Sequence, residues 1–140
     1  MKAPINADPT PIAADLGREQ LDAVSHAVIG AAQRVNNTLG YGFLEKVYEN
    51  SLAVQLRSEG WRVAQQLPVH VHYQGQVVGN YLPDLLVEDC VLAEVKAVSW
   101  LDRMHRQQCI NYLKATNFRV CLLINFGQAR LEVKRLVWNF

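Results

Sequence analysis

The feature that most constrains the fold of this chain is an almost unbroken apolar segment, RVCLLINF, at residues 119–126. Such a run is typical of a central β-strand that is buried on both faces of a sheet. The preceding residues 100–116 carry apolar side chains at helical spacing, and residues 91–98 before them have strand-forming sequence. A strand, a helix and a second strand in this order are what a crossover connection requires. The order favours a parallel arrangement of these two strands.

The remaining segments complete a mixed α/β layout of helix, helix, three strands, helix, strand and strand. Apolar residues recur at helical spacing over residues 18–39, and a second helix is expected over residues 43–59. Two segments with alternating polarity, residues 62–73 and 77–87, are joined by a Gln-Gly-Gln sequence that favours a hairpin turn. A short last strand is expected at a sheet edge over residues 130–138.

Length and composition limit the domain organisation. With 140 residues, of which 50% are hydrophobic, the chain can bury the core of one domain. Prolines near the start indicate an unstructured lead-in over residues 1–15, which leaves residues 16–140 for the single domain. No apolar run approaches the roughly 18–20 residues of a membrane span, and the first residues lack the apolar segment of a signal peptide. We therefore expect a cytoplasmic protein without a membrane partner.

The cysteine pattern argues against two common structural devices. Cys90, Cys109 and Cys121 are odd in number, widely spaced and without a Cys-x-x-Cys pair. A disulfide framework or a zinc site would show paired spacings. We therefore expect buried or free thiols.

Charge is distributed unevenly along the chain. Residues 1–93 carry six Lys or Arg against ten Asp or Glu, whereas residues 94–140 carry eight against three. The basic C-terminal third could supply phosphate contacts if the fold gathers its cations on one surface. The alternative is ordinary solvated charge, which the sequence pI of about 7.8 favours, because dedicated nucleic-acid binders are more basic.

Charged side chains are embedded in two of the strand segments. Pro83-Asp84 is followed ten residues later by Glu94-Val95-Lys96. Because strand side chains alternate between faces, Glu94 and Lys96 project from one side and Val95 from the other. Two carboxylates can hold a hard divalent cation, and a lysine beside them can orient a water or neutralise negative charge. The pattern indicates metal-assisted phosphodiester hydrolysis.

Whether Asp84 joins Glu94 depends on the turn between the two strands. A two-residue turn would set Asp84 opposite Ala93, on the face away from Glu94. A three-residue turn, or a bulge, would set Asp84 opposite Glu94. A shared site therefore predicts a three-residue turn at residues 88–90.

Two helical segments can add polar groups to this site. On a wheel of roughly 100° per residue, Glu45 falls on the inward arc of the second helix; the alternative is a partly exposed acid stabilised by the helix dipole. In the third helix, Gln108 and Tyr112 lie four residues apart and share an inward arc with His105. Such groups can bind a phosphate or orient a water, or they can simply satisfy buried backbone groups.

Together these residues resemble a known protein family. The segment Gly42-Phe-Leu-Glu45-Lys-Val-Tyr48 matches the signature of the GxxExxY proteins, a bacterial group in the PD-(D/E)xK nuclease superfamily. The resemblance covers about residues 21–137, and its Gln-x-x-x-Tyr spacing is similar to the RecB-type branch of that superfamily. Glu-x-Lys alone is a weak signal for this superfamily. The ordered set of polar residues is much more specific; it consists of Glu45, Asp84, Glu94, Lys96, Gln108 and Tyr112.

The resemblance implies an α/β fold with a restriction-endonuclease-like core, in which helices flank a mixed central sheet. It also implies a Mg²⁺ or Mn²⁺ cofactor. By similarity, Asp84 and Glu94 would ligate one or two ions, and the Val95 carbonyl would be a further ligand. Glu45 would bind the metal directly or through a water.

The same resemblance implies catalytic roles for the remaining polar residues. Lys96 would position or activate the attacking water and stabilise charge in the transition state. Gln108 and Tyr112 would steady the site and the substrate backbone.

Two functions remain open at this point. The first is a metal-dependent nuclease that hydrolyses phosphodiester bonds, with DNA favoured over RNA. The second is a nuclease-fold module with weak or no turnover that binds nucleic acid or a protein partner, because a fold does not prove an activity. The sequence leaves the oligomeric state undetermined.

Overall fold

The structure is a computed structural model that describes residues 17–140. The lead-in expected over residues 1–15 lies outside these described residues. Within them, the elements in chain order are α2 (Arg18–Leu39), α3 (Glu45–Ser58), β1 (Val63–Gln65), β2 (Val69–Tyr73), β3 (Gln76–Tyr81), β4 (Leu85–Val87), β5 (Val91–Lys96), α4 (Arg103–Thr116), β6 (Val120–Asn125) and β7 (Glu132–Val137).

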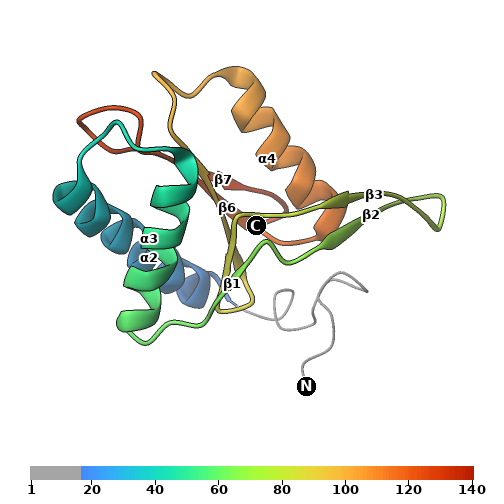
Figure 1. Cartoon of the computed structure of the whole chain (residues 1–140). Helices are drawn as coiled ribbons and strands as arrows, with labels where there is room; N and C mark the ends of the chain where they lie inside the picture. Colours follow the sequence, from blue (N-terminus) through green and yellow to red (C-terminus); the bar gives the residue numbers. More distant parts are fainter. Residues whose placement is uncertain (1–16) are drawn as a thin grey trace.

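Five strands form the central sheet in the order β1-β4-β5-β6-β7, with the helices on either side of it (Figure 1). β5 and β6 are parallel, and the other neighbouring pairs of this sheet are antiparallel. α4 connects the two parallel strands, so the expected crossover is confirmed. The RVCLLINF segment contains β6, an inner strand in which all residues are buried.

The two strand segments expected over residues 62–73 and 77–87 are each divided in two. β1 pairs with β4 in the central sheet, whereas β2 and β3 pair with each other in a separate ribbon. Pro68 and Pro83 lie at the breaks, where a residue without an N–H cannot continue a ladder. The expected hairpin joins β2 to β3 through the two residues at 74–75, whose φ angles are positive, and the ribbon projects away from the sheet on the side of α4 (Figure 1).

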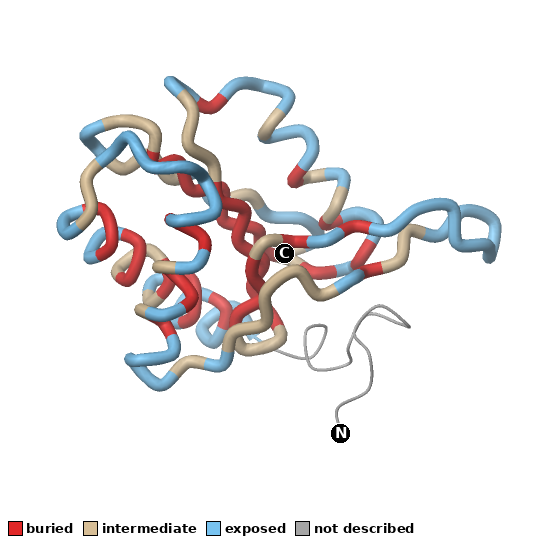
Figure 2. Tube along the Cα trace, in the orientation of Figure 1, coloured by how far each residue is buried: buried red, intermediate tan, exposed pale blue. Residues whose placement is uncertain are grey.

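The central sheet is covered on both faces. One face packs against α2 and α3 in a core that includes Leu21, Tyr48 and Leu52. The other face packs against α4 and the base of the ribbon in a core that includes Tyr81 and Leu113. In Figure 2 the buried residues follow the sheet and the helix sides that face it, while the outer end of the ribbon is exposed.

The helices follow the expected segments with small shifts in their first turns. α2 spans the expected residues, and α3 begins two residues later than expected, at Glu45. α4 begins at Arg103 because Asp102 caps it: the Asp102 carboxylate accepts a hydrogen bond from the His105 N–H at 3.0 Å. The His105 ring accepts in turn from the Asp102 N–H, which completes a capping box.

Two expectations from composition can be compared with the described part of the chain. No helix within residues 17–140 is long and apolar enough to cross a membrane. Cys90, Cys109 and Cys121 are all free and buried, as expected.

Candidate active site

The turn between β4 and β5 fixes which side chains face each other. Leu85 lies opposite Ala93, so the same register places Asp84 opposite Glu94. The three residues at 88–90 separate the paired ends of the strands, and two of them have positive φ angles. The three-residue turn that a shared site requires is therefore confirmed.

Reciprocal hydrogen bonds join the two carboxylates to the facing backbone. The Asp84 N–H donates to Glu94 Oε2 at 2.8 Å, and the Val95 N–H donates to Asp84 Oδ2 at 2.8 Å. Because the N–H and C=O of one strand residue point to the same side, the Val95 carbonyl also faces β4. The residue opposite in this register is Pro83, which has no N–H to donate to that carbonyl.

Burial and mutual repulsion shift the protonation of both acids. Glu94 is only 8% exposed, and burial, followed by the charge of Asp84, raises the pKa of Glu94 to about 8. Lys96, on the same strand face, acts in the opposite direction. Burial also raises the pKa of Asp84, and the charges of Glu49 and Glu45 add to that shift. A bound cation would relieve this repulsion.

Two stacked tyrosines border Glu94. The rings of Tyr81 on β3 and Tyr112 on α4 have centroids 3.4 Å apart at an angle of 18°. Burial, followed by the Glu94 charge, raises the pKa of each tyrosine. The Tyr81 hydroxyl is buried beside the Glu94 carboxylate, and its interaction with that carboxylate acts to lower the pKa of Glu94.

The loop before α3 is tied to the helix by Tyr48. Its hydroxyl donates to the Gly40 carbonyl at 2.6 Å and accepts from the Phe43 N–H at 3.1 Å. Tyr48 is fully buried, so these bonds are shielded from water. They fix the approach of the chain to Glu45, the first residue of α3.

Glu45 itself is exposed at the start of α3, which agrees with the alternative of an exposed acid and corrects the inward position. It shares the helix direction of Leu52, which is fully buried, but it lies in the first turn, next to the exposed Leu44. A helical wheel gives the direction of a side chain but does not show which turns of the helix are covered by the sheet. Glu45 remains near enough for its charge to raise the pKa of Asp84.

The orientation of α4 also differs from the expected one. Its buried residues are Cys109, Leu113 and Thr116, whereas Gln108 is exposed and Tyr112 is half-buried. Gln108 therefore lies at the border of the buried side of the helix. Polar residues at such a border can reach a substrate without the desolvation that full burial requires.

Sequence reasoning missed three residues that shape the site. Glu49 is buried one turn after Glu45, and Gln66 Nε2 donates to Asp84 Oδ1 at 3.1 Å. The Asn125 side chain, fully buried, donates to the Val98 carbonyl and accepts from the Val98 N–H, each at 2.9 Å. It thereby fixes the loop after Lys96. The spacing of Glu49, one helical turn after Glu45, could have identified it as a site residue. No sequence pattern identifies Gln66 or Asn125, because their partners are distant in sequence.

Comparison with known proteins assigns the fold to a family. A sequence model described as the PD-(D/E)XK nuclease superfamily matches residues 22–136. The chain belongs to the PD-(D/E)XK nuclease superfamily. A solved structure, the alkaline exonuclease LHK-Exo from Laribacter hongkongensis, is 13% identical, with a TM-score of 0.43 over 82% of this chain and 69% of the exonuclease. A search of curated proteins found no match.

Superfamily membership confirms the expected fold class, an α/β core with a mixed sheet flanked by helices. Nucleases of the PD-(D/E)XK superfamily typically use divalent metals. In residues 17–140, no three His, Cys, Asp or Glu side chains form a cluster that could hold a metal by themselves. Asp84, Glu94 and the Val95 carbonyl nevertheless fit a hard cation, because all three offer oxygen and the carboxylate charges are only partly compensated.

Two basic residues of the C-terminal third make contacts with groups other than these carboxylates. Arg135 forms an ion pair with Asp22 on α2 at 2.5 Å. Lys114 lies over the Trp138 ring, 4.9 Å from its centroid. These contacts support the alternative of ordinary surface charge for Arg135 and Lys114.

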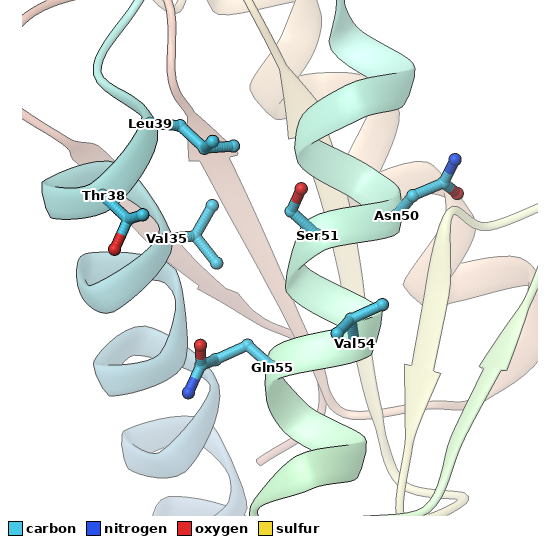
Figure 3. A pocket seen from close by; sticks show the side chains of 7 residues that line it. All are labelled: Val35, Thr38, Leu39, Asn50, Ser51, Val54 and Gln55. Atoms are coloured by element: carbon cyan, nitrogen blue, oxygen red, sulfur yellow. The ribbon is translucent and has the colours of Figure 1, made fainter.

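A hollow of about 310 Å³ lies between α2 and α3 (Figure 3). It is lined by Val35, Thr38, Leu39, Asn50, Ser51, Val54 and Gln55. None of these side chains is an acid, a base or a reactive thiol, so the hollow offers no hydrolytic chemistry. It is also distinct from the carboxylate site, which is formed by Asp84, directly before β4, and by Glu94 on β5.

Proposed function

We propose that the protein is a divalent-metal-dependent nuclease that hydrolyses phosphodiester bonds, with DNA favoured over RNA, and that it belongs to the GxxExxY group of its superfamily. The observation that carries the proposal is the pairing of Asp84 with Glu94. Their register and reciprocal hydrogen bonds bring two acids together at one point of the sheet, and Lys96 shares the face of Glu94. A structural role for two buried acids would demand neutralising partners, and the partial compensation found here favours a cation site.

In this proposal, Asp84, Glu94 and the Val95 carbonyl hold Mg²⁺ or Mn²⁺. Glu45, exposed at the start of α3, contributes through a water. When bound, the metal polarises the phosphoryl oxygen and lowers the pKa of water. The chain supplies fixed oxygens for it, since each carboxylate is oriented by a backbone N–H.

Lys96 positions the attacking water and stabilises the negative charge that develops on the phosphate. Its place on β5 is rigid, because the Lys96 carbonyl accepts from the Phe126 N–H at 2.8 Å. Gln108 contacts the substrate backbone from the exposed border of α4, and Tyr112 holds the wall of the site beside Glu94.

The test is cleavage of DNA and RNA substrates with Mg²⁺, Mn²⁺ or chelator, in the wild type and in Asp84→Asn, Lys96→Ala and Lys134→Ala. Asp84→Asn and Lys96→Ala should each reduce the rate by roughly 100-fold or more. Lys134→Ala, an exposed change on β7, should leave the rate unchanged. Chelator-insensitive cleavage, or equal rates in all variants, would falsify the proposal.

A second candidate function is a binding module for a protein partner, and the ribbon favours it. Residues 63–83 contain no Asp, Glu, Lys or Arg, and every residue of β3 except Tyr81 is exposed. Exposed strands are usually protected by charge. Partner binding that persists in Asp84→Asn and Lys96→Ala, without cleavage under any metal, would support this candidate.

A further inference from the structure

Glu49 is an acid in a position where acids are rarely found. Its side chain is only 4% exposed, although it lies on a helix whose neighbouring residues Lys46 and Asn50 are exposed. An ionised carboxylate that is withdrawn from water needs several donors. Its partners therefore indicate what it does.

Three side chains donate to the Glu49 carboxylate. Lys46 Nζ lies 3.1 Å from Oε2, and Gln65 Nε2 donates to the same oxygen at 2.9 Å. Gln66 Nε2 lies 3.3 Å from Oε1 and 3.4 Å from Oε2. The same Gln66 nitrogen donates to Asp84 Oδ1 at 3.1 Å. One amide group thus bridges the carboxylates of Glu49 and Asp84.

The bridge is held by the backbone as well as by side chains. Gln66 follows β1 directly and has a positive φ of 54°. Its N–H lies 3.1 Å from the Pro83 carbonyl and 3.2 Å from the Asp84 carbonyl. Gln66 is thus fixed beside Asp84 before its amide reaches the two acids.

As a result, both oxygens of Asp84 are oriented. Oδ2 accepts from the Val95 N–H, and Oδ1 accepts from Gln66. A carboxylate oxygen that accepts one hydrogen bond still has a lone pair for a metal. The negative charge of Glu49 also lies close to Asp84, which increases the attraction of this corner of the site for a cation.

We propose that Glu49 is a positioning residue of the metal site, which orients Asp84 through the Gln66 amide and adds negative potential without contacting the metal. This inference rests on the proposed metal-dependent activity. Glu45 cannot replace Glu49 in this role, because Glu45 is exposed at the start of α3.

The test measures Mn²⁺ binding by titration calorimetry, with the metal alone as the ligand, in full-length wild type, Glu49→Gln and Gln66→Ala. Glu49→Gln keeps the shape of the side chain and removes its charge, and Gln66→Ala removes the bridge. Each should weaken Mn²⁺ binding by roughly tenfold, the loss typical of residues that orient a metal ligand. Glu59→Gln is the control. Glu59 is the C-cap residue of α3 and pairs with Arg34, so this variant removes a paired acid of the same helix that has no contact with Asp84 or Gln66.

Cleavage provides the second measurement. The Mn²⁺ concentration for half-maximal rate should rise by the same factor in Glu49→Gln, whereas the rate at saturating Mn²⁺ should stay close to wild type. The double variant, with Glu49→Gln and Gln66→Ala, should bind Mn²⁺ less weakly than the product of the two single losses predicts. Both changes interrupt the same connection from Glu49 through Gln66 to Asp84. A merely structural Glu49 would lower the metal-free melting temperature without moving Mn²⁺ affinity.

The outcomes separate this inference from the proposed function. Wild type that binds Mn²⁺ and cleaves, with both variants binding Mn²⁺ equally well, overturns the role of Glu49 alone. Wild type that neither binds Mn²⁺ nor cleaves overturns the proposed function on which the role rests. If Glu49→Gln does not fold, Gln66→Ala decides the question by the same tenfold criterion.

Discussion

The ring of Tyr81 stacks on the ring of Tyr112 with their centroids 3.4 Å apart, and this contact joins the ribbon to α4 beside Glu94. Tyr81 is 5% exposed and ends β3, whereas Tyr112 is half-buried on α4. A ring pair of this kind contributes about 0.5–1.5 kcal/mol beyond the burial of its surface. The wall of the candidate site therefore depends on two elements that are separate in sequence.

Two variants separate the role of the Tyr112 ring from the role of its hydroxyl. Tyr112→Ala should lower the free energy of unfolding by about 2–3 kcal/mol, because it removes the stacked ring and leaves a gap. Tyr112→Phe keeps the ring and should change stability by less than ~0.5 kcal/mol. Denaturant unfolding measures both effects. A large loss of cleavage in Tyr112→Phe at unchanged stability would show that the hydroxyl contacts the substrate.

Glu94 predicts a specific dependence of metal-free stability on pH. Its pKa is about 8 in the folded protein, above the ordinary value of 4.5 for a glutamate, so the folded state binds the proton more tightly. The contribution of Glu94 to stability is therefore present below pH 4.5 and is lost as pH rises to about 8. The loss is on the order of a few kcal/mol.

The comparison that isolates this effect is with Glu94→Gln, which resembles the protonated acid. The wild type should lose stability relative to Glu94→Gln as pH rises from 5 to 9 in the presence of chelator, as measured by urea unfolding. Mn²⁺ should restore the wild type at high pH and leave Glu94→Gln unaffected, because the cation replaces the proton. Parallel pH profiles for the two proteins would contradict the raised pKa.

The Tyr48 hydroxyl should stabilise the loop before α3 through its two hydrogen bonds. Tyr48→Phe keeps the stacking on Phe126, whose ring centroid is 4.7 Å away, but removes the partner of the Gly40 carbonyl and the Phe43 N–H. The free energy of unfolding should fall by about 1–3 kcal/mol. Tyr41→Phe, an exposed change in the same loop, is the control and should have no measurable effect. Equal melting curves for both variants would show that the hydrogen bonds of the Tyr48 hydroxyl do not stabilise the protein.

Two glycines should respond to alanine in opposite directions. Gly42 has a φ of 112°, so Gly42→Ala should destabilise the protein by at least ~1 kcal/mol through backbone strain alone, since nothing lies within 4 Å of the added Cβ. Gly30 lies inside α2, and Gly30→Ala should stabilise the helix by about 0.5–1 kcal/mol. Thermal unfolding of the two variants checks the signs. Destabilisation by Gly30→Ala would mean that the contact of the new Cβ with Arg34 is less tolerant than its 3.5 Å separation indicates.

The residues that could be placed from sequence are those whose position depends on local periodicity. The apolar run at 119–126 and the helix before it predicted the parallel pair of β5 and β6. The demand that Asp84 share a face with Glu94 predicted the three-residue turn, because register in a hairpin follows from turn length. Local pattern also gave the helix of residues 18–39.

The residues that sequence misplaced depend on how far one element covers another. Glu45 has the direction expected of an inward position, but it lies in the first turn of α3, beyond the part that the sheet covers, and is exposed. Gln108 is exposed because the buried side of α4 is centred on Cys109 and Leu113, which leaves Gln108 at its border. The breaks at Pro68 and Pro83 were missed as well, because alternation continues through each proline although the ladder does not.

The sequence by itself thus determined the three helices, the strands β5, β6 and β7, the face shared by Glu94 and Lys96, and the family signature around Glu45. Tertiary structure alone decided that Glu49 is the buried acid of α3 and that Gln66 connects it to Asp84. The physical reason is that periodicity fixes the direction of a side chain along its own element. Burial and charge partners arise only when distant segments pack together.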